Sequence, residues 1–291
     1  MKKKQRKTEK APFFKESLQT IKRNKAVSAV YFILRFAVIA IAVLSLLGGN
    51  YEHLFICILV LILFLLPSFF QRKLQIELPS TLEIIIICFI FAAEILGELQ
   101  NYFIQYPNWD TMLHTLSGFL LAAVGFSMVD ILNRNKPESF SLSPLFLARV
   151  AFCFSMTAGV LWEFFEILVE RVFLLDLQKD TGVHTISSVA RDASRQNIPI
   201  VIKDITDVAV NGQSLGLGGY QDIGLYDTME DLFVNFIGAV VFSTIGYFYV
   251  RNQSNHRNDA SQKVVSQFVP RIRTGVEPSD SPPQDDATSE S

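Results

Sequence analysis

Three polar side chains follow one another at four-residue spacing where an apolar stretch begins: Asp227, Asp231 and Asn235. In a helix this spacing places all three on one face. If residues 228–250 cross a bilayer, that face carries carboxylates from the headgroup region into hydrocarbon, where ionisable groups are costly and usually functional. The pattern therefore predicts a polar site inside a membrane protein.

A second copy of this motif lies earlier in the chain. Trp109-Asp-Thr-Met opens one apolar segment as Tyr226-Asp-Thr-Met opens another. His114 then occupies the position that Asp231 has in the second copy. Each copy follows an apolar segment with two acids near its end, Glu94 with Glu98 and Glu163 with Glu166. We therefore expect two helical hairpins related by a pseudo-two-fold axis along the membrane normal, with polar groups of four helices at matched depths.

A divalent metal ion is the cofactor that these residue types indicate. Carboxylates with one imidazole suit Zn, Mn or Mg, and the ligand set does not choose among the three metals. The expected metal ligands are Asp110, His114, Asp227 and Asp231. We assign Glu163 as the general base. The rest of the polar layer is Glu94, Glu98, Glu166 and Asn235.

Helix capping is a competing explanation for some of these residues. Asp227 with Glu230 fits a capping box at the start of a helix, and Asp110 is placed to cap in the same way. Asp231, His114 and Glu163 lie beyond the cap positions in apolar surroundings, so capping does not account for them. The three cysteines lie in separate apolar runs, which indicates packing residues rather than a disulfide framework or a metal site.

The elements that would position this site are apolar segments. Hydrophobic residues make up 50% of the 291 residues, which argues against an ordinary soluble domain and predicts an all-α polytopic membrane protein. A segment of about 20 apolar residues spans a bilayer. Six segments reach this length, at roughly 26–48, 51–70, 81–104, 111–133, 146–174 and 228–250. Nothing in the chain indicates a nucleic-acid partner, so the bilayer is the expected partner.

Charge predicts how the segments are oriented. Residues 1–25 are basic and residues 251–291 are polar, so we expect two cytoplasmic tails around a membrane domain at 26–250. Arg72 and Lys73 fall in a loop that this count places inside, in agreement with the positive-inside rule. The loop 175–226 is expected outside as a small insertion. Within it, Asn211-Gly212 predicts a β-hairpin, and the stretch near Ser187 to Gln196 predicts a polar helix.

The ordered motifs resemble the YjdF-like family of bacterial inner-membrane proteins and, more distantly, the VanZ-like membrane proteins. They are Trp109-Asp-Thr-Met-Leu-His114, Trp162-Glu163-Phe-Phe-Glu166, and Tyr226-Asp-Thr-Met-Glu-Asp231 with Asn235 and Gly238. The resemblance covers about residues 94–247. It implies a small multi-pass protein of the bacterial inner membrane, in a family without an established reaction. The VanZ-like comparison implies a role in the cell envelope, although Thr-Met stands here where VanZ-like motifs usually carry a Lys.

Three functions are compatible with this pattern. The first is a metal-dependent hydrolase or transferase that acts on an amphiphilic lipid or lipid-linked substrate from the outer leaflet. The second is a proton- or cation-coupled transporter that uses the same carboxylates as a relay. The third is a noncatalytic envelope scaffold in which the polar layer locks helix packing through interhelical hydrogen bonds.

Overall fold

The structure, a computed structural model, describes residues 25–74, 76–134, 142–174, 176–253, 265–269 and 271–272. The described residues fall into two compact units, one within 1–90 and 269–291 and the other within 91–268. Apart from Lys25, the predicted basic tail lies outside the described residues. Most of the predicted tail at 251–291 also lies outside them.

The first unit is built from helices with one small sheet. It contains α2 (Lys25–Leu47), α3 (Tyr51–Leu63), α4 (Leu66–Leu74), most of α5 (Ser80–Phe91), and β1 (Ile76–Glu77) paired with β8 (Arg271–Ile272). The Asn50 side chain accepts the His53 N–H at 3.2 Å and so caps the start of α3. The rings of Tyr31 and Phe64 pack edge to face at 6.5 Å, which holds α2 against the end of α3.

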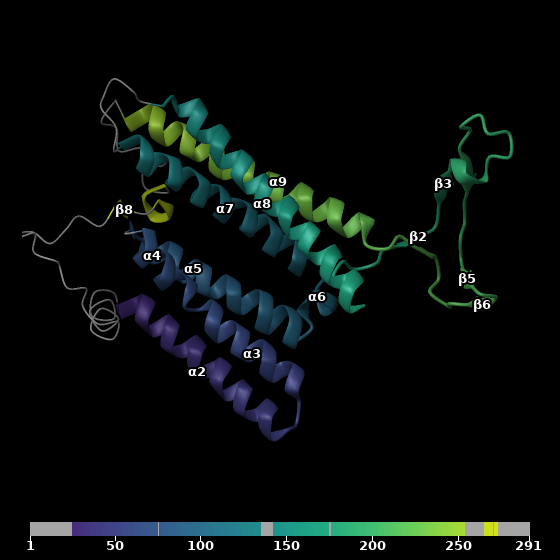
Figure 1. The fold of residues 1–291 in the computed structure, drawn as a ribbon, viewed down its shortest axis with the longest axis horizontal. Helices are drawn as coiled ribbons and strands as arrows, with labels where there is room; N and C mark the ends of the chain where they lie inside the picture. Colours follow the sequence, from purple (N-terminus) through teal and green to yellow (C-terminus); the bar gives the residue numbers. More distant parts are fainter. Residues whose placement is uncertain are drawn as a thin grey trace, which may run out of the picture. The chain divides into compact units, whose positions relative to one another are not determined.

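The second unit is a bundle of long helices with an inserted loop (Figure 1). It contains the π-helix η1 (Ala92–Leu99), α6 (Tyr102–Gln105), α7 (Trp109–Arg134), α8 (Pro144–Phe173) and α9 (Leu225–Gln253). Each of α7, α8 and α9 packs against the other two. The Ser143 hydroxyl accepts the Phe146 N–H at 3.2 Å, and Pro144 follows it, which is a favourable start for α8.

Two glycines bring the backbones of α7 and α9 together. A Cβ added at Gly118 would lie 2.2 Å from the carbonyl oxygen of Asn235. A Cβ added at Gly238 would lie 2.1 Å from the carbonyl oxygen of Thr115. Small residues allow such close packing between helices in membranes. The polar face of α9 is therefore held directly against α7.

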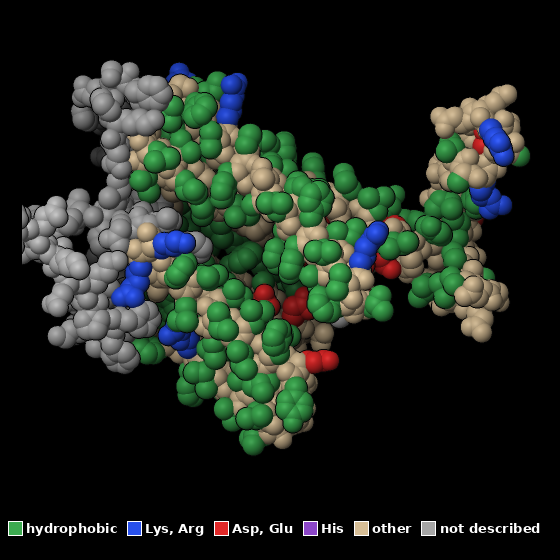
Figure 2. All heavy atoms as spheres, viewed as in Figure 1, with side chains coloured by type: hydrophobic (Ala, Val, Ile, Leu, Met, Phe, Trp, Pro, Cys, Tyr) green, Lys and Arg blue, Asp and Glu red, His purple; other side chains and the backbone are tan. Residues whose placement is uncertain are grey.

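Five helices in the described residues are long and apolar enough to cross a membrane: Ala26–Leu47, Tyr51–Lys73, Trp109–Asn133, Pro144–Phe173 and Leu225–Asn252. Many hydrophobic side chains lie on the surface of the molecule (Figure 2). On these helices Phe36 is 76% exposed and Phe164 63%. Such a surface suits lipid and not water. The expected crossing at 81–104 is not among the five, because α5 gives way to a π-helix at Ala92.

The loop between α8 and α9 carries three short antiparallel pairs of strands that extend from the helix ends (Figure 1). They are β2 (Gly182–Val183) with β7 (Tyr220–Gln221), β3 (Ile186–Ser188) with β4 (Ile200–Ile202), and β5 (Ala209–Val210) with β6 (Gln213–Ser214). Asn211 (φ 53°) and Gly212 (φ 82°) form the turn between β5 and β6. This confirms the predicted hairpin, since both residues tolerate the positive φ that such a turn requires.

The polar helix expected near Ser187 to Gln196 is wrong. Only Val189–Arg191 is helical, as one 3-10 turn, because the preceding residues pair in β3. The carboxylate of Asp192 then accepts the N–H groups of Ser194, Gln196 and Ile198 at 2.9–3.0 Å. A side-chain acceptor of this kind competes with helix formation, which sequence periodicity does not reveal.

Replacing Asp192 with Ala is expected to open this turn. The Ser194 hydroxyl and the following N–H groups lower the pKa of Asp192 to about 2. The ionised carboxylate therefore stabilises the turn above its ordinary pKa, and that stabilisation is lost as pH falls through about 2. At neutral pH, trypsin should cleave after Arg195 severalfold faster in Asp192→Ala, measured by mass spectrometry of the fragments. The control Asp207→Ala, whose carboxylate binds Gly216 instead, should cleave at the normal rate; equal rates in both variants would contradict the assignment.

Candidate metal centre

The first residue of α9 determines whether Asp227 can cap the helix. The helix begins at Leu225, so Asp227 lies in its first turn and not at the cap. Asp222 accepts the Tyr226 N–H at 2.6 Å, whereas Asp227 Oδ2 accepts the backbone N–H of Lys179 at 2.9 Å. The capping box expected at Asp227 is therefore wrong, because that motif requires the helix to begin at Thr228 and it begins three residues earlier, at Leu225.

The other two residues with a capping explanation also lie inside helices. Asp110 is in the first turn of α7, which begins at Trp109. Glu230 of α9 accepts a hydrogen bond from the Thr111 hydroxyl at 3.3 Å. Glu230 therefore joins α9 to α7 instead of reaching back along its own helix.

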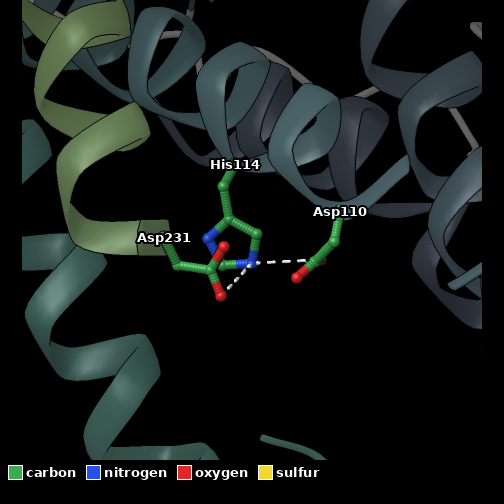
Figure 3. A group of neighbouring side chains, drawn as sticks. All are labelled: Asp110, His114 and Asp231. Atoms are coloured by element: carbon green, nitrogen blue, oxygen red, sulfur yellow. Dashed lines mark ion pairs between the residues drawn. The ribbon is translucent and has the colours of Figure 1, made fainter. Parts of the chain in front are cut away.

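Three helices bring three of the predicted carboxylates together around the imidazole of His114. His114 Nε2 lies 3.5 Å from Asp110 Oδ1 and 3.6 Å from Asp231 Oδ2 (Figure 3). On the other side of the ring, His114 Nδ1 lies 4.0 Å from Glu163 Oε1. Asp110 and His114 belong to α7, Asp231 to α9 and Glu163 to α8. Both ring nitrogens of His114 thus face carboxylates.

The spacing of three donor atoms suits a metal ion. One ligand atom each from Asp110, His114 and Asp231 lies within 4.8 Å of the other two. Two ligands bound at about 2.0–2.2 Å with tetrahedral angles stand roughly 3.3–3.6 Å apart. The two distances from His114 Nε2, 3.5 and 3.6 Å, fall within this interval or at its end. Asp227 does not belong to this group of three.

The centre is buried and short of positive charge. Glu163 is 4% exposed, Asp231 3% and Asn235 2%. Among the described residues, Glu163 Oε2 and Asn235 Oδ1 have no hydrogen-bond partner, although Gln178 and Thr228 lie beside the Glu163 carboxyl group. Within the part of the chain that the structure describes, Asp110, Glu163 and Asp231 form ion pairs only with His114. The Lys179 ammonium acts electrostatically on Asp110 and Asp227, but in the described residues it forms no ion pair with Asp231 or Glu163. Buried carboxylates with so little positive charge are unfavourable, so the arrangement calls for a bound cation or bound protons.

The remaining predicted residues lie around this centre in different settings. Asp227 is within electrostatic reach of Asp110 and His114. Glu166 accepts a hydrogen bond from Trp162 Nε1 at 2.9 Å. Asn235 Nδ2 lies 3.6 Å from Met156 Sδ, one turn along α9 from Asp231. Glu94 and Glu98 lie on the π-helix η1, and in the described residues neither pairs with His114.

The sequence did not reveal the part that the loop plays at this site. Gln178 is 4% exposed, and its Nε2 donates to the Thr228 hydroxyl at 2.6 Å. Its backbone N–H donates to Glu170 Oε2 at 3.3 Å, which ties the loop to the end of α8. Gly224 packs so closely that an added Cβ would lie 2.6 Å from Gln178 Cβ. Gly224 also has a positive φ of 74°. The sequence shows neither this backbone conformation nor the contact with Gln178.

Comparison with known proteins gives one match. The model of a family described as "Predicted membrane protein (DUF2238)" matches residues 29–252, which include all the helices of the site. No curated protein and no solved structure matches the chain significantly.

Proposed function

We propose that this chain, which belongs to the DUF2238 family of predicted membrane proteins, is a metal-dependent membrane enzyme. The proposed reaction is hydrolysis or group transfer on a lipid or lipid-linked substrate of the cell envelope. One observation carries the proposal: three donor atoms from α7 and α9 lie at the spacing of metal ligands, beside a buried carboxylate that has an unpartnered oxygen. The motif resemblance to YjdF-like and VanZ-like proteins supports the assignment to the envelope.

Asp110, His114 and Asp231 would hold a Zn, Mn or Mg ion, with Asp227 close by. A divalent ion at this position supplies a Lewis acid. Glu163 has two distinct oxygens in this arrangement. Oε1 faces His114 Nδ1, where a carboxylate orients a metal-binding imidazole, while Oε2 has no hydrogen-bond partner and is available to accept a proton. Glu163 is therefore the proposed general base.

The surroundings of the site support an amphiphilic substrate. On α8, the side chains next to Glu163 in the sequence, Trp162 and Phe164, are exposed hydrophobic groups. On α9, Met229 and Phe233, two residues before and two residues after Asp231, are also exposed hydrophobic groups. A lipid in the adjoining leaflet would reach the polar centre along this apolar surface. The start of the loop, anchored through the buried Gln178, would close the site on the aqueous side.

The proposed topology has six crossings in a bacterial inner membrane, with both termini in the cytoplasm. The sixth crossing would be Ser80 to Leu99, a continuous helical run of about 20 residues, which is the length of a span. The long loop at 175–226 and the metal centre would then lie at the outer face. The repeated Asp-Thr-Met motif at the starts of α7 and α9 supports a pseudo-two-fold relation between the two hairpins.

Glu163→Gln is expected to abolish turnover while metal binding is retained. The amide keeps an oxygen that faces His114 Nδ1 but does not act as a base, so the rate should fall by about 10²–10⁴. The assay incubates metal-loaded protein in nanodiscs of bacterial phospholipid extract and measures the release of water-soluble headgroups by mass spectrometry. The bound metal is quantified in the same samples.

The matched control is Glu166→Gln, a change of the same size one turn along α8, at a residue that binds Trp162 and not His114. It should keep most of the activity. If metal-loaded wild-type protein releases no product, the enzyme proposal fails. If Glu163→Gln and wild-type turn over equally, the assignment of the base fails.

A proton- or cation-coupled transporter is the second candidate, and one feature favours it. The π-helix Ala92–Leu99 interrupts regular helix in a segment of membrane length and carries Glu94 and Glu98. Irregular helices occur at the ion sites of transporters, and π-helical segments are frequent at functional sites. Cation flux into proteoliposomes that stops in Glu94→Gln, without product release in the lipid assay, would favour transport over catalysis.

A further inference from the structure

A groove lies between α8 and α9 at the end of the bundle opposite the metal centre. It is lined by residues from the first turns of α8 and the last turns of α9, and its volume is about 360 Å³. The hydrophobic part of the lining is Leu145, Ala148, Phe152, Val240 and Phe248. The polar part is Arg149, Ser243, Thr244 and Tyr247, and the lining includes no Asp or Glu.

Two polar side chains of this groove, Ser243 and Arg149, have no partner among the described residues. Ser243 is 7% exposed, and among the described residues its hydroxyl has no hydrogen-bond partner. A serine within a helix usually satisfies its hydroxyl on a backbone carbonyl of the preceding turn, so this exception is informative. Within the described ranges, Arg149 forms no ion pair. It lies about 8 Å along α8 from the first residue of that helix.

A second cation adds to the positive charge at this place. Arg251, in the last turn of α9, has Nη1 3.5 Å from the Tyr247 hydroxyl, and its guanidinium lies 5.9 Å from the centre of the Tyr247 ring. Tyr247 also lines the groove. The groove therefore combines the Arg149 guanidinium and hydroxyl groups with hydrophobic side chains, and Arg251 lies beside it at Tyr247. This combination matches an amphiphile with an anionic head.

We propose that this groove binds an anionic phospholipid, with its phosphate at Arg149 and the first part of its acyl chains against Phe152 and Val240. Basic pockets between membrane helices bind anionic headgroups by the same combination of charge and apolar contact. Ordinary snorkelling would explain Arg149 alone, but it does not account for the buried unpartnered hydroxyl of Ser243. The volume is at the lower end of the range for ligand sites, about 300–1,000 Å³, and so accommodates a headgroup region and not a whole lipid. This binding site is independent of the metal centre.

Lipid titration followed by native mass spectrometry tests this site. Purified full-length protein should bind phosphatidylglycerol in preference to phosphatidylcholine. Arg149→Ala should weaken phosphatidylglycerol binding by about fivefold, as expected for one cation near an anionic headgroup. Ser243→Leu, which fills the groove, should weaken it as well, and its thermal unfolding temperature is measured to verify that the variant is folded.

The matched control is Arg171→Ala, which removes the same charge from the opposite end of α8. This variant should bind phosphatidylglycerol as the wild type does. Equal weakening in Arg171→Ala and Arg149→Ala would show a general charge effect and overturn the proposal, as would equal binding of the two lipids by the wild type. Inorganic phosphate is added in a parallel series; displacement of the lipid by phosphate alone would assign the groove to a soluble anion instead.

Discussion

The double variant His114→Ala/Asp231→Asn is expected to lose its bound divalent metal, with affinity reduced more than about 100-fold. The physical reason is that these residues supply two of the three clustered donor atoms. Loss of one outer-shell partner already lowers metal affinity by about 10–100-fold, and loss of two ligands should exceed that. The measurement is elemental analysis of purified protein, followed by competition titration with a chelator.

Glu230→Gln is the matched control for this experiment. It removes a charge on α9 next to Asp231 in the sequence, at an exposed residue that binds Thr111 instead of His114. Its metal content should equal that of the wild type. Equal, near-zero metal in the wild type and in the double variant would refute the metal centre. If, in addition, Asp231→Asn were stable and functional, the result would indicate that the carboxylates only hold the helices together, as in an envelope scaffold.

Gly238→Ala is expected to destabilise the helix bundle by about 1–3 kcal/mol, the usual cost of forcing a methyl group into a filled contact. The added Cβ would lie 2.1 Å from the backbone oxygen of Thr115, which has no rotamer by which to move away. Either α7 and α9 separate or the neighbouring turn distorts. The measurement is the free energy of unfolding in detergent, and Gly118→Ala should give a loss of the same sign because it meets Asn235 at 2.2 Å.

The same substitution should also weaken metal binding, because the proposed ligands His114 of α7 and Asp231 of α9 lie 3.6 Å apart across this contact. Gly182→Ala is the control, since no atom lies within 4 Å of the Cβ that it adds. If Gly238→Ala behaves like this control in both measurements, the close approach of α7 and α9 is wrong.

The membrane class and most of the helices could be predicted from local sequence. A run of apolar residues of bilayer length has few alternatives to a helix, because its backbone groups find no water to bind. The expected segments at 111–133 and 146–174 therefore match α7 and α8 within a few residues. The Asn211-Gly212 turn could be predicted for a similar reason, since the φ angles it requires depend on those two residues alone.

Chain composition did not predict the π-helix at Ala92 or the first residue of α9. The position of the π-helix and the start of α9 both depend on which acceptor each backbone N–H binds. Local helix propensities differ too little to determine that acceptor. At α9 the side chain of Asp222 accepts the Tyr226 N–H, so Asp227 is left for the N–H of Lys179. Whether Asp227 caps α9 or belongs to the site is therefore decided by its contact with Lys179, which lies 48 residues earlier in the chain.

The four-residue spacing in the sequence was sufficient to place Asp227, Asp231 and Asn235 on one face of a helix, and the repeated motif indicated His114 as a companion. Helical periodicity does not specify which helix faces which. The contacts of Gly118 and Gly238 bring α7 against α9, and the packing of α8 brings Glu163 to the far side of the His114 ring. Tertiary packing alone thus selected Asp110, His114 and Asp231 as one group and separated them from Glu94, Glu98 and Glu166, because a common site needs donor atoms within a few ångströms.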